Sequence, residues 1–126
     1  MQPDHPPALY SADLSGCANL AKLSAGAIAA TFCAALRRAG ATVVEEVSHA
    51  FPGTGLTCVL ILSESHAVLH TWPETGTVNI DIFSCSTRLK SLEAIDELKR
   101  SFGATSVVLQ ETSRADGHGP RSNPSA

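Results

Sequence analysis

Four consecutive segments between residues 42 and 84 have the composition of β-strands, and this run limits the fold more than any other feature. Val, Ile, Leu and Thr are frequent in the segments, as expected of strands. Pro52-Gly53-Thr54-Gly55 and Pro73-Glu74-Thr75-Gly76 interrupt the run with residues that favour turns. Short turns connect antiparallel neighbours, so we expect antiparallel pairing of Thr42–Ala50, Leu56–Ser63, His66–Thr71 and Thr77–Ser84.

Two helices are expected outside this run. Apolar residues recur at helical spacing from Cys17 to Ala39, where Gly40 can cap the end, and again from Leu89 to Phe102. Further strands are predicted at Ala8–Leu14 and Ala104–Gln110. The order predicts an α+β fold: a two-layer sandwich in which two helices cover one face of a mainly antiparallel sheet.

The last strand of the run has two different faces. One carries Val78, Ile80 and Ile82, which suit packing against helices. The other is too polar for a core and is free to form a site or to meet a partner; it carries Thr77, Asn79, Asp81, Phe83 and Cys85.

The chain length and composition suit one domain. Of 126 residues, 44% are hydrophobic and 17% charged, which predicts a folded core over most of the chain. We place the domain at residues 8–111. Residues 1–7, with three prolines, are expected to form a flexible arm, and residues 112–126, rich in Ser, Gly and Pro, a disordered tail.

Charge and hydropathy argue against several classes of protein. The net charge is −3 and no basic stripe exists, so we expect no nucleic-acid partner. The N-terminal residues do not resemble a signal peptide, and the longest apolar run, Cys58–Leu62, is too short for a membrane span. A cytoplasmic protein is therefore expected, in which the four cysteines are free thiols.

Three short motifs carry the most information about function. They are Ser63-Glu64-Ser65-His66, His70-Thr71-Trp72-Pro73-Glu74, and the strand Asp81–Ser84 followed by Cys85. Together and in this order, they resemble the signature of the prokaryotic S-adenosylmethionine decarboxylase proenzymes, and the resemblance extends more weakly over residues 8–111.

The resemblance implies that the chain cuts itself between Glu64 and Ser65. Attack of the Ser65 hydroxyl on the Glu64 carbonyl, followed by β-elimination and hydrolysis, would leave a β chain of residues 1–64 and an α chain that begins with a pyruvoyl group made from Ser65. That group would form a Schiff base with the substrate amine and accept electrons as CO2 leaves. No metal or separate organic cofactor is expected.

Roles for other residues follow from the same resemblance. His70 would assist processing, and Cys85 would donate the proton in decarboxylation; imidazole and thiol both have pKa values suited to such transfers. The remaining positions bind adenine and ribose, or support processing: Phe51, Trp72 and Glu74 for the substrate, and Thr57 (usually serine in the family) and Ser63 for processing.

One feature of the spacing opposes a simple site. Ser65 and His70 are five residues apart, so an unbroken strand directs them to opposite faces. They can meet only if the chain kinks near the cleavage point or if the strands curl.

The chain departs from the family in two places. Thr75-Gly76-Thr77 stands where the family often has aromatic-Gly-aromatic, and Pro6-Pro7-Ala8 replaces a usual Gly and His before the first strand. The first departure leaves the substrate open.

Decarboxylation of S-adenosylmethionine, giving the aminopropyl donor for spermidine, is the leading hypothesis. The alternatives are pyruvoyl-dependent decarboxylation of ornithine or arginine, and a non-catalytic regulatory paralogue. A metal site from His66, His70 and Cys85 is a minor alternative, since no fourth ligand has a suitable spacing. The family also implies a homodimer of processed protomers with sites shared between subunits.

Overall fold

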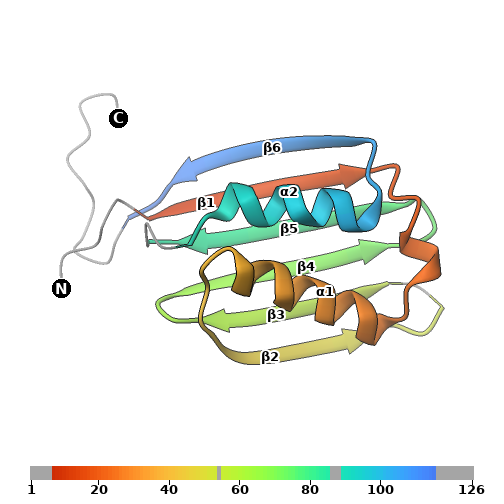
Figure 1. The fold of residues 1–126 in the computed structure, drawn as a ribbon, viewed down its shortest axis with the longest axis horizontal. Helices are drawn as coiled ribbons and strands as arrows, with labels where there is room; N and C mark the ends of the chain where they lie inside the picture. The colour runs from red at the N-terminus through yellow and green to blue at the C-terminus, as the bar shows by residue number, and fades with distance from the viewer. Residues whose placement is uncertain (1–6, 54, 86–88, 116–126) are drawn as a thin grey trace.

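The computed structural model describes residues 7–53, 55–85 and 89–115. It contains a strand, a short 3-10 turn and a helix, then four strands, a second helix and a last strand (Figure 1). The elements are β1 (Ala8–Ser15), η1 (Leu20–Lys22), α1 (Ala25–Arg38), β2 (Val43–Ala50), β3 (Leu56–Leu62), β4 (Ser65–Trp72), β5 (Thr77–Ser84), α2 (Ser91–Phe102) and β6 (Ser106–Ser113).

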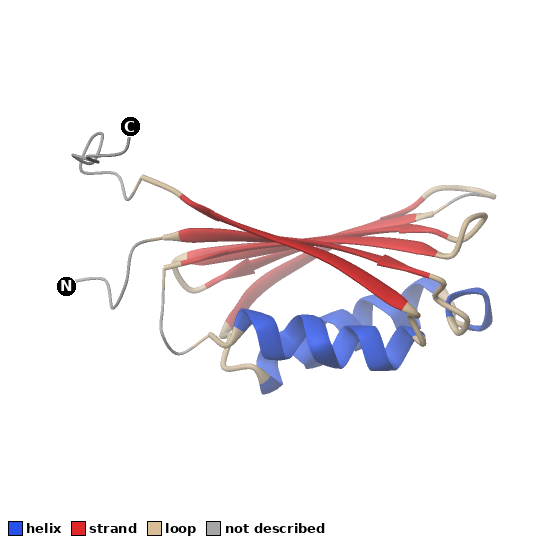
Figure 2. Ribbon diagram, turned by 90° about the horizontal axis from the view of Figure 1, so that it is seen from above, coloured by secondary structure: helices blue, strands red, loops and turns tan. Residues whose placement is uncertain are grey.

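The strands form one sheet in the order β2-β3-β4-β5-β1-β6, and every neighbouring pair is antiparallel. Both helices lie on the same face of the sheet, and no helix or strand of the described residues covers the other face (Figure 2). The predicted two-layer α+β sandwich is confirmed. β1 lies between β5 and β6, so the N-terminal strand completes a sheet whose other neighbours are mostly consecutive in sequence.

Alternation along the strands separates a buried face from an open one. In β5, Val78, Ile80 and Ile82 are fully buried towards the helices, as their spacing predicted. In β4, Ala67, Leu69 and Thr71 are buried in the same way. The residues between them form the side of the sheet that the helices do not cover, which we call the open face.

The core lies between the sheet and the helices. Both helices contribute fully buried side chains, and each buried Phe or Leu stabilises the fold by roughly 1.5–3 kcal/mol. The residues concerned are Phe32 and Leu36 on α1 and Leu98 and Phe102 on α2.

The first helix is shorter than the predicted range of Cys17–Ala39. It begins at Ala25 because the Ser24 hydroxyl accepts a hydrogen bond from the backbone N–H of Ala27 at 3.1 Å, which caps the helix there. The preceding segment bonds instead to the end of α2: the Asn19 N–H donates to the Phe102 carbonyl at 3.0 Å. Tertiary contacts thus override helical periodicity in residues 17–23.

Other boundaries differ less. α2 begins at Ser91 rather than Leu89 and ends at Phe102, as predicted, where Gly103 with a φ of 68° caps the helix. β6 begins at Ser106 and pairs with β1 as far as Ser113, so the first two residues of the expected tail are strand.

The expected N-terminal arm also differs from the structure at its last residue. Pro7 was expected to belong to a flexible arm, but its carbonyl accepts a hydrogen bond from the Arg114 N–H at 2.9 Å. The rest of the expected arm, residues 1–6, and residues 116–126 of the expected tail lie outside the described residues.

Candidate functional site

The turn between β3 and β4 contains the Glu64–Ser65 bond, which was predicted to be cleaved. Leu62 pairs with Ser65, so Ser63 and Glu64 form a two-residue loop. Glu64 has a φ of 60°, and it is the one residue other than glycine in the described part of the chain with a positive φ. A left-handed conformation of this kind costs a non-glycine residue about 1–3 kcal/mol. Strain is therefore stored next to the Glu64–Ser65 peptide.

Cys85 lies against the same turn. The pairing of His66 with Phe83 brings the end of β5 beside the start of β4, and Cys85 follows that end. Its thiol donates a hydrogen bond to the Glu64 carbonyl, with Sγ 3.2 Å from the oxygen. The carbonyl that Ser65 would attack is thus already in contact with a proton donor.

Cys85 differs from the other three cysteines. All four are free thiols, but Cys17, Cys33 and Cys58 are buried in the core, whereas Cys85 is half-buried. Burial raises the pKa of the Cys17 and Cys58 thiols. Cys33 and Cys58 are thus small core residues.

Ser65 and His70 do not meet within one chain. β4 pairs regularly with β3 and β5 along this stretch, so neither the kink nor the curl that could unite them is present. Five residues of strand separate the two positions by about 16 Å. Ser65 has the parity of the buried Ala67, whereas His70 belongs to the open face.

A second group of predicted residues gathers around His70. His70 is paired with Thr57 across β3 and β4, and the Thr57 hydroxyl lies 2.7 Å from its Nδ1 atom. The ring of Trp72 meets the imidazole edge-on, with centroids 4.5 Å apart, and the centroid of the Phe51 ring lies 6.3 Å from that of the imidazole. Phe51 itself is 4.5 Å from the His49 ring.

These aromatic rings are available to a ligand. Phe51 is 42% exposed and Trp72 is 45% exposed, although large aromatic side chains are usually well buried. Two exposed rings near one imidazole can stack on a flat heterocycle.

Glu74 lies in the exposed turn that follows Trp72, at the same end of the sheet. The turn is closed by the Thr75 N–H, which donates to the Trp72 carbonyl at 3.2 Å. The Thr75 and Thr77 hydroxyls are 3.0 Å apart. Small hydrogen-bonded side chains therefore occupy the positions where the family often has aromatic rings.

Two further residues, neither of them predicted as a site residue, contact this group. Asn79 accepts a hydrogen bond from the Trp72 indole N–H at 2.6 Å, and its amide N–H donates to the Asp13 carboxylate at 2.8 Å. Alternation had placed Asn79 on the polar face, and the register of the β4–β5 hairpin could have placed it beside Trp72. The contact with Asp13 depends on a pairing 66 residues apart in sequence.

The suggested metal ligands do not assemble. His66 instead stacks on Phe83, with ring centroids 5.2 Å apart and an interplanar angle of 16°. Within residues 7–53, 55–85 and 89–115, no group of three or more His, Cys, Asp or Glu side chains is arranged to hold a metal ion.

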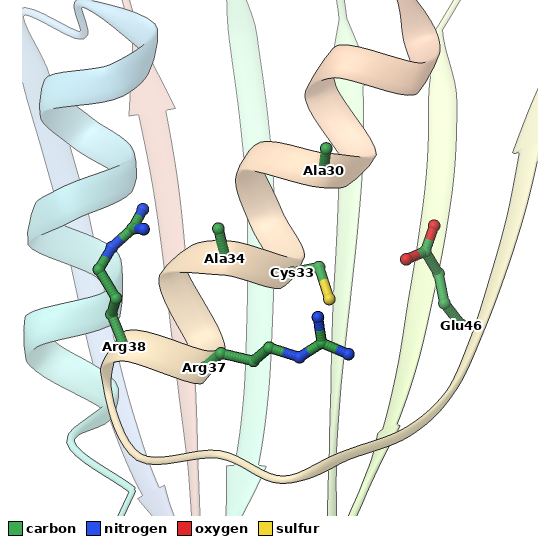
Figure 3. A pocket seen from close by; sticks show the side chains of 6 residues that line it. All are labelled: Ala30, Cys33, Ala34, Arg37, Arg38 and Glu46. Carbon is green, nitrogen blue, oxygen red and sulfur yellow. The ribbon is translucent and has the colours of Figure 1, made fainter.

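A pocket on the helix side of the sheet is separate from these residues. It lies between α1 and β2 and is lined by Ala30, Cys33, Ala34, Arg37, Arg38 and Glu46 (Figure 3). The Arg38 guanidinium binds Glu97 on α2, with Nε 3.0 Å from both carboxylate oxygens. None of the residues predicted to act in catalysis or substrate binding lines this pocket.

No helix in the described part of the chain is both long and apolar enough to cross a membrane.

Comparison with known proteins gives one consistent family. The sequence profile described as S-adenosylmethionine decarboxylase matches residues 8–115. The S-adenosylmethionine decarboxylase proenzyme of Acidithiobacillus ferrooxidans is 39% identical over 80 residues, which are 64% of this chain and 60% of that protein. The Prochlorococcus marinus proenzyme is 36% identical over 84 residues, 67% of each chain. The matched region thus spans about three fifths of the Acidithiobacillus relative.

The fold agrees with these sequence matches. The crystal structure of the adenosylmethionine decarboxylase from Aquifex aeolicus superposes with a TM-score of 0.77, covering 94% of this chain and 98% of that one at 22% sequence identity. The profile covers most of the chain, including the three motifs. The chain therefore belongs to the S-adenosylmethionine decarboxylase family.

Proposed function

We propose that this protein cuts itself between Glu64 and Ser65 to form a pyruvoyl group and then decarboxylates S-adenosylmethionine. The observation that carries the proposal is the Glu64 backbone, held in a left-handed conformation with its carbonyl bonded to Cys85. The choice of S-adenosylmethionine as the substrate rests on family membership, since the curated relatives are named for it.

Self-cleavage requires the Ser65 hydroxyl to attack the Glu64 carbonyl carbon. The C–N bond then breaks and an ester replaces the amide, which releases the strained peptide. Loss of the Ser65 Cα proton expels the Glu64 carboxylate, and the dehydroalanine left behind takes up water and releases ammonia. A thiol bonded to the Glu64 carbonyl polarises it, and so stabilises the negative charge that develops on this oxygen.

The residues present suit the pyruvoyl group. Once formed, it supplies a carbonyl that condenses with the substrate amine and takes up the electrons released with CO2. Cys85 reaches the backbone at the cleavage point, so its thiol can hold a proton close to the new N-terminus. We assign it the proton that replaces CO2 on the substrate carbon.

The exposed rings support a nucleoside substrate. Phe51 and Trp72 both lie near His70, and each exposes more than two fifths of its surface. Adenine can stack on such rings, and a carboxylate such as Glu74 can accept hydrogen bonds from both ribose hydroxyls. His70, fixed by Thr57, is proposed to take the Cα proton during elimination.

The active unit is proposed to be a homodimer with shared sites. Ser65 lies about 16 Å along the sheet from His70, and Cys85 lies at the same end as Ser65. Within one chain, His70 therefore does not reach the Ser65 Cα proton that it is proposed to take. The open face also exposes Val47 (54%) and Ile61 (42%) on adjacent strands, and apolar side chains of this kind favour contact with another protein surface. A second copy packed against this face with its strands reversed would join the turn of one subunit to the His70 group of the other.

The alternatives have less support. Decarboxylation of ornithine or arginine would use the same turn but would leave the exposed Phe51 and Trp72 without a purpose. A non-catalytic paralogue has no need of a strained turn in contact with a thiol. The cytoplasmic location expected from the N-terminal sequence stays a prediction, as does the use of the product as the aminopropyl donor for spermidine.

The test is CO2 release from carboxyl-labelled S-adenosylmethionine, ornithine and arginine by the purified full chain. We expect turnover of S-adenosylmethionine alone, in a preparation that mass spectrometry shows to be cut. A cut protein that prefers ornithine or arginine would overturn the substrate, and a cut protein inactive on all three would overturn the reaction. A protein that never cuts would support the regulatory paralogue.

A further inference from the structure

A hydrogen-bonded relay crosses three strands of the open face and ends on the single tryptophan of the chain. It runs from Asp13 on β1 through Asn79 on β5 to Trp72 on β4, with distances of 2.8 and 2.6 Å. We propose that Asp13 and Asn79 are positioning residues that fix the plane of the Trp72 ring for the incoming substrate. The inference rests on the proposed role of Trp72 in stacking on a nucleoside.

The sheet register explains why these residues can meet. Asp13 is directly paired with Asn79, and Asn79 is directly paired with His70. Trp72 lies two residues beyond His70, so its ring reaches Asn79 along the diagonal, a distance that suits aromatic side chains. The relay is therefore part of a regular row of side chains on the open face.

The donors and acceptors allow one direction only. An indole N–H can only donate, and an ionised carboxylate can only accept. The Asn79 amide must then turn its oxygen to Trp72 and its NH2 group to Asp13, which is the arrangement observed. Without the Asp13 carboxylate, the amide could turn over and place NH2 against the indole N–H, which would break the bond that holds the ring.

Trp72 needs such support because it is 45% exposed. An exposed ring is not held by core packing, and ordering it when the ligand binds would cost affinity. Here the N–H is held by Asn79, and the ring meets His70 edge-on at 4.5 Å. The ring is thus oriented before the substrate arrives.

The test uses Asn79→Ala, which removes the relay, and Asp13→Asn, which keeps the size of the side chain but not its acceptor-only character. Asp81→Asn is the control, because it makes the same charge change on the same face, at the next outward position of β5. Time-resolved fluorescence anisotropy reports on Trp72 alone, and it is measured in the Ser65→Ala background so that cleavage does not enter.

We expect faster local motion of the indole in Asn79→Ala and Asp13→Asn, but not in Asp81→Asn. In proteins that can cut, the KM for S-adenosylmethionine should rise about three- to tenfold, with kcat within about twofold of the original value. Unchanged anisotropy in both variants would overturn the relay. Altered anisotropy with an unchanged KM would overturn the claim that Asp13 and Asn79 orient Trp72 for the substrate.

The two readouts separate this inference from the proposed function. The anisotropy needs no substrate, so the relay can be verified or rejected even in a protein that never decarboxylates S-adenosylmethionine. Should Asn79→Ala fail to fold, Asp13→Asn carries the test, because it changes one exposed oxygen to an NH2 group.

Discussion

The two ends of β4 are held in different ways. At its start, a two-residue turn places Glu64 in a left-handed conformation, and one thiol contacts the strained carbonyl. Near its end, His70 and Trp72 are held without positive φ by hydrogen bonds from neighbouring strands. The first arrangement suits a bond that must break once, and the second suits a surface that must bind a ligand repeatedly. One strand thus carries two functions that its own length keeps apart.

Ser65→Ala should have the largest effect, because it removes the nucleophile at the strained end. We expect an uncut chain and no measurable CO2 release. A denaturing gel and the intact mass would show whether the chain is cut. Ser106→Ala, on an exposed part of β6, is the matched control and should cut normally. A cut Ser65→Ala protein would disprove the assignment of the nucleophile.

Cys85→Ala should have the second-largest effect. The protein should still cut, but more slowly, because the Glu64 carbonyl loses its contact with the thiol. In the cut protein, the rate of CO2 release should fall by about a hundredfold or more, because a positioned proton donor contributes on this scale. Cys33→Ala changes a buried thiol on α1 and should keep most of the activity. Wild-type turnover by Cys85→Ala would remove this thiol from the chemistry.

Co-expression of Ser65→Ala with His70→Ala tests whether the two ends work across a dimer. Random pairing gives mixed dimers with one complete site, so activity should return to about a quarter of the wild-type level. Ser65→Ala with Cys85→Ala is the control, because both changes lie at the same end and no mixed dimer contains a complete site. Equal results from the two pairs would rule out shared sites.

Glu64→Gly should show the strain directly. Glycine adopts a positive φ without the steric cost, so the uncut protein should gain about 1 kcal/mol in free energy of unfolding relative to Glu64→Ala. Urea denaturation in the Ser65→Ala background measures this without interference from cleavage. With Ser65 present, Glu64→Gly should cut more slowly. No difference between glycine and alanine would mean that the turn stores no strain.

The smallest effect is expected far from both ends, at the pair of Arg38 and Glu97 that joins the helices. Hydrogen bonding to Arg38 lowers the pKa of the Glu97 carboxyl. The pair therefore stabilises the fold above the ordinary titration range of a carboxyl, and this contribution is lost as the pH falls through the lowered pKa. Glu97→Gln should lower the urea midpoint slightly at pH 7 and match the wild type in acid, with cleavage unchanged. A larger loss in acid than at pH 7 would contradict the sign.

Much of this organisation could be predicted from local pattern. Alternation in β5 separated the buried Val78, Ile80 and Ile82 from the open face, and short turns indicated antiparallel neighbours. The start of α1 could not be predicted in this way, because residues 17–23 keep helical periodicity but bond to the end of α2.

The residues of the site were predicted one by one from the motifs. Their separation into two groups at the ends of β4 was indicated only by strand parity. Strand parity already opposed a meeting of Ser65 and His70, and the regular register of β4 bears this out. The role of Asp13 could not be predicted from local sequence pattern, because its contact with Asn79 exists only through the insertion of β1 between β5 and β6.

The most direct test of self-cleavage is the intact mass of the wild-type protein after storage in its folded state. We predict two fragments. The N-terminal one ends at Glu64, and the C-terminal one is lighter by one ammonia than a hydrolysis product and reacts with a carbonyl reagent. A single uncut chain, or a C-terminal fragment that begins with an ordinary serine, would contradict the account.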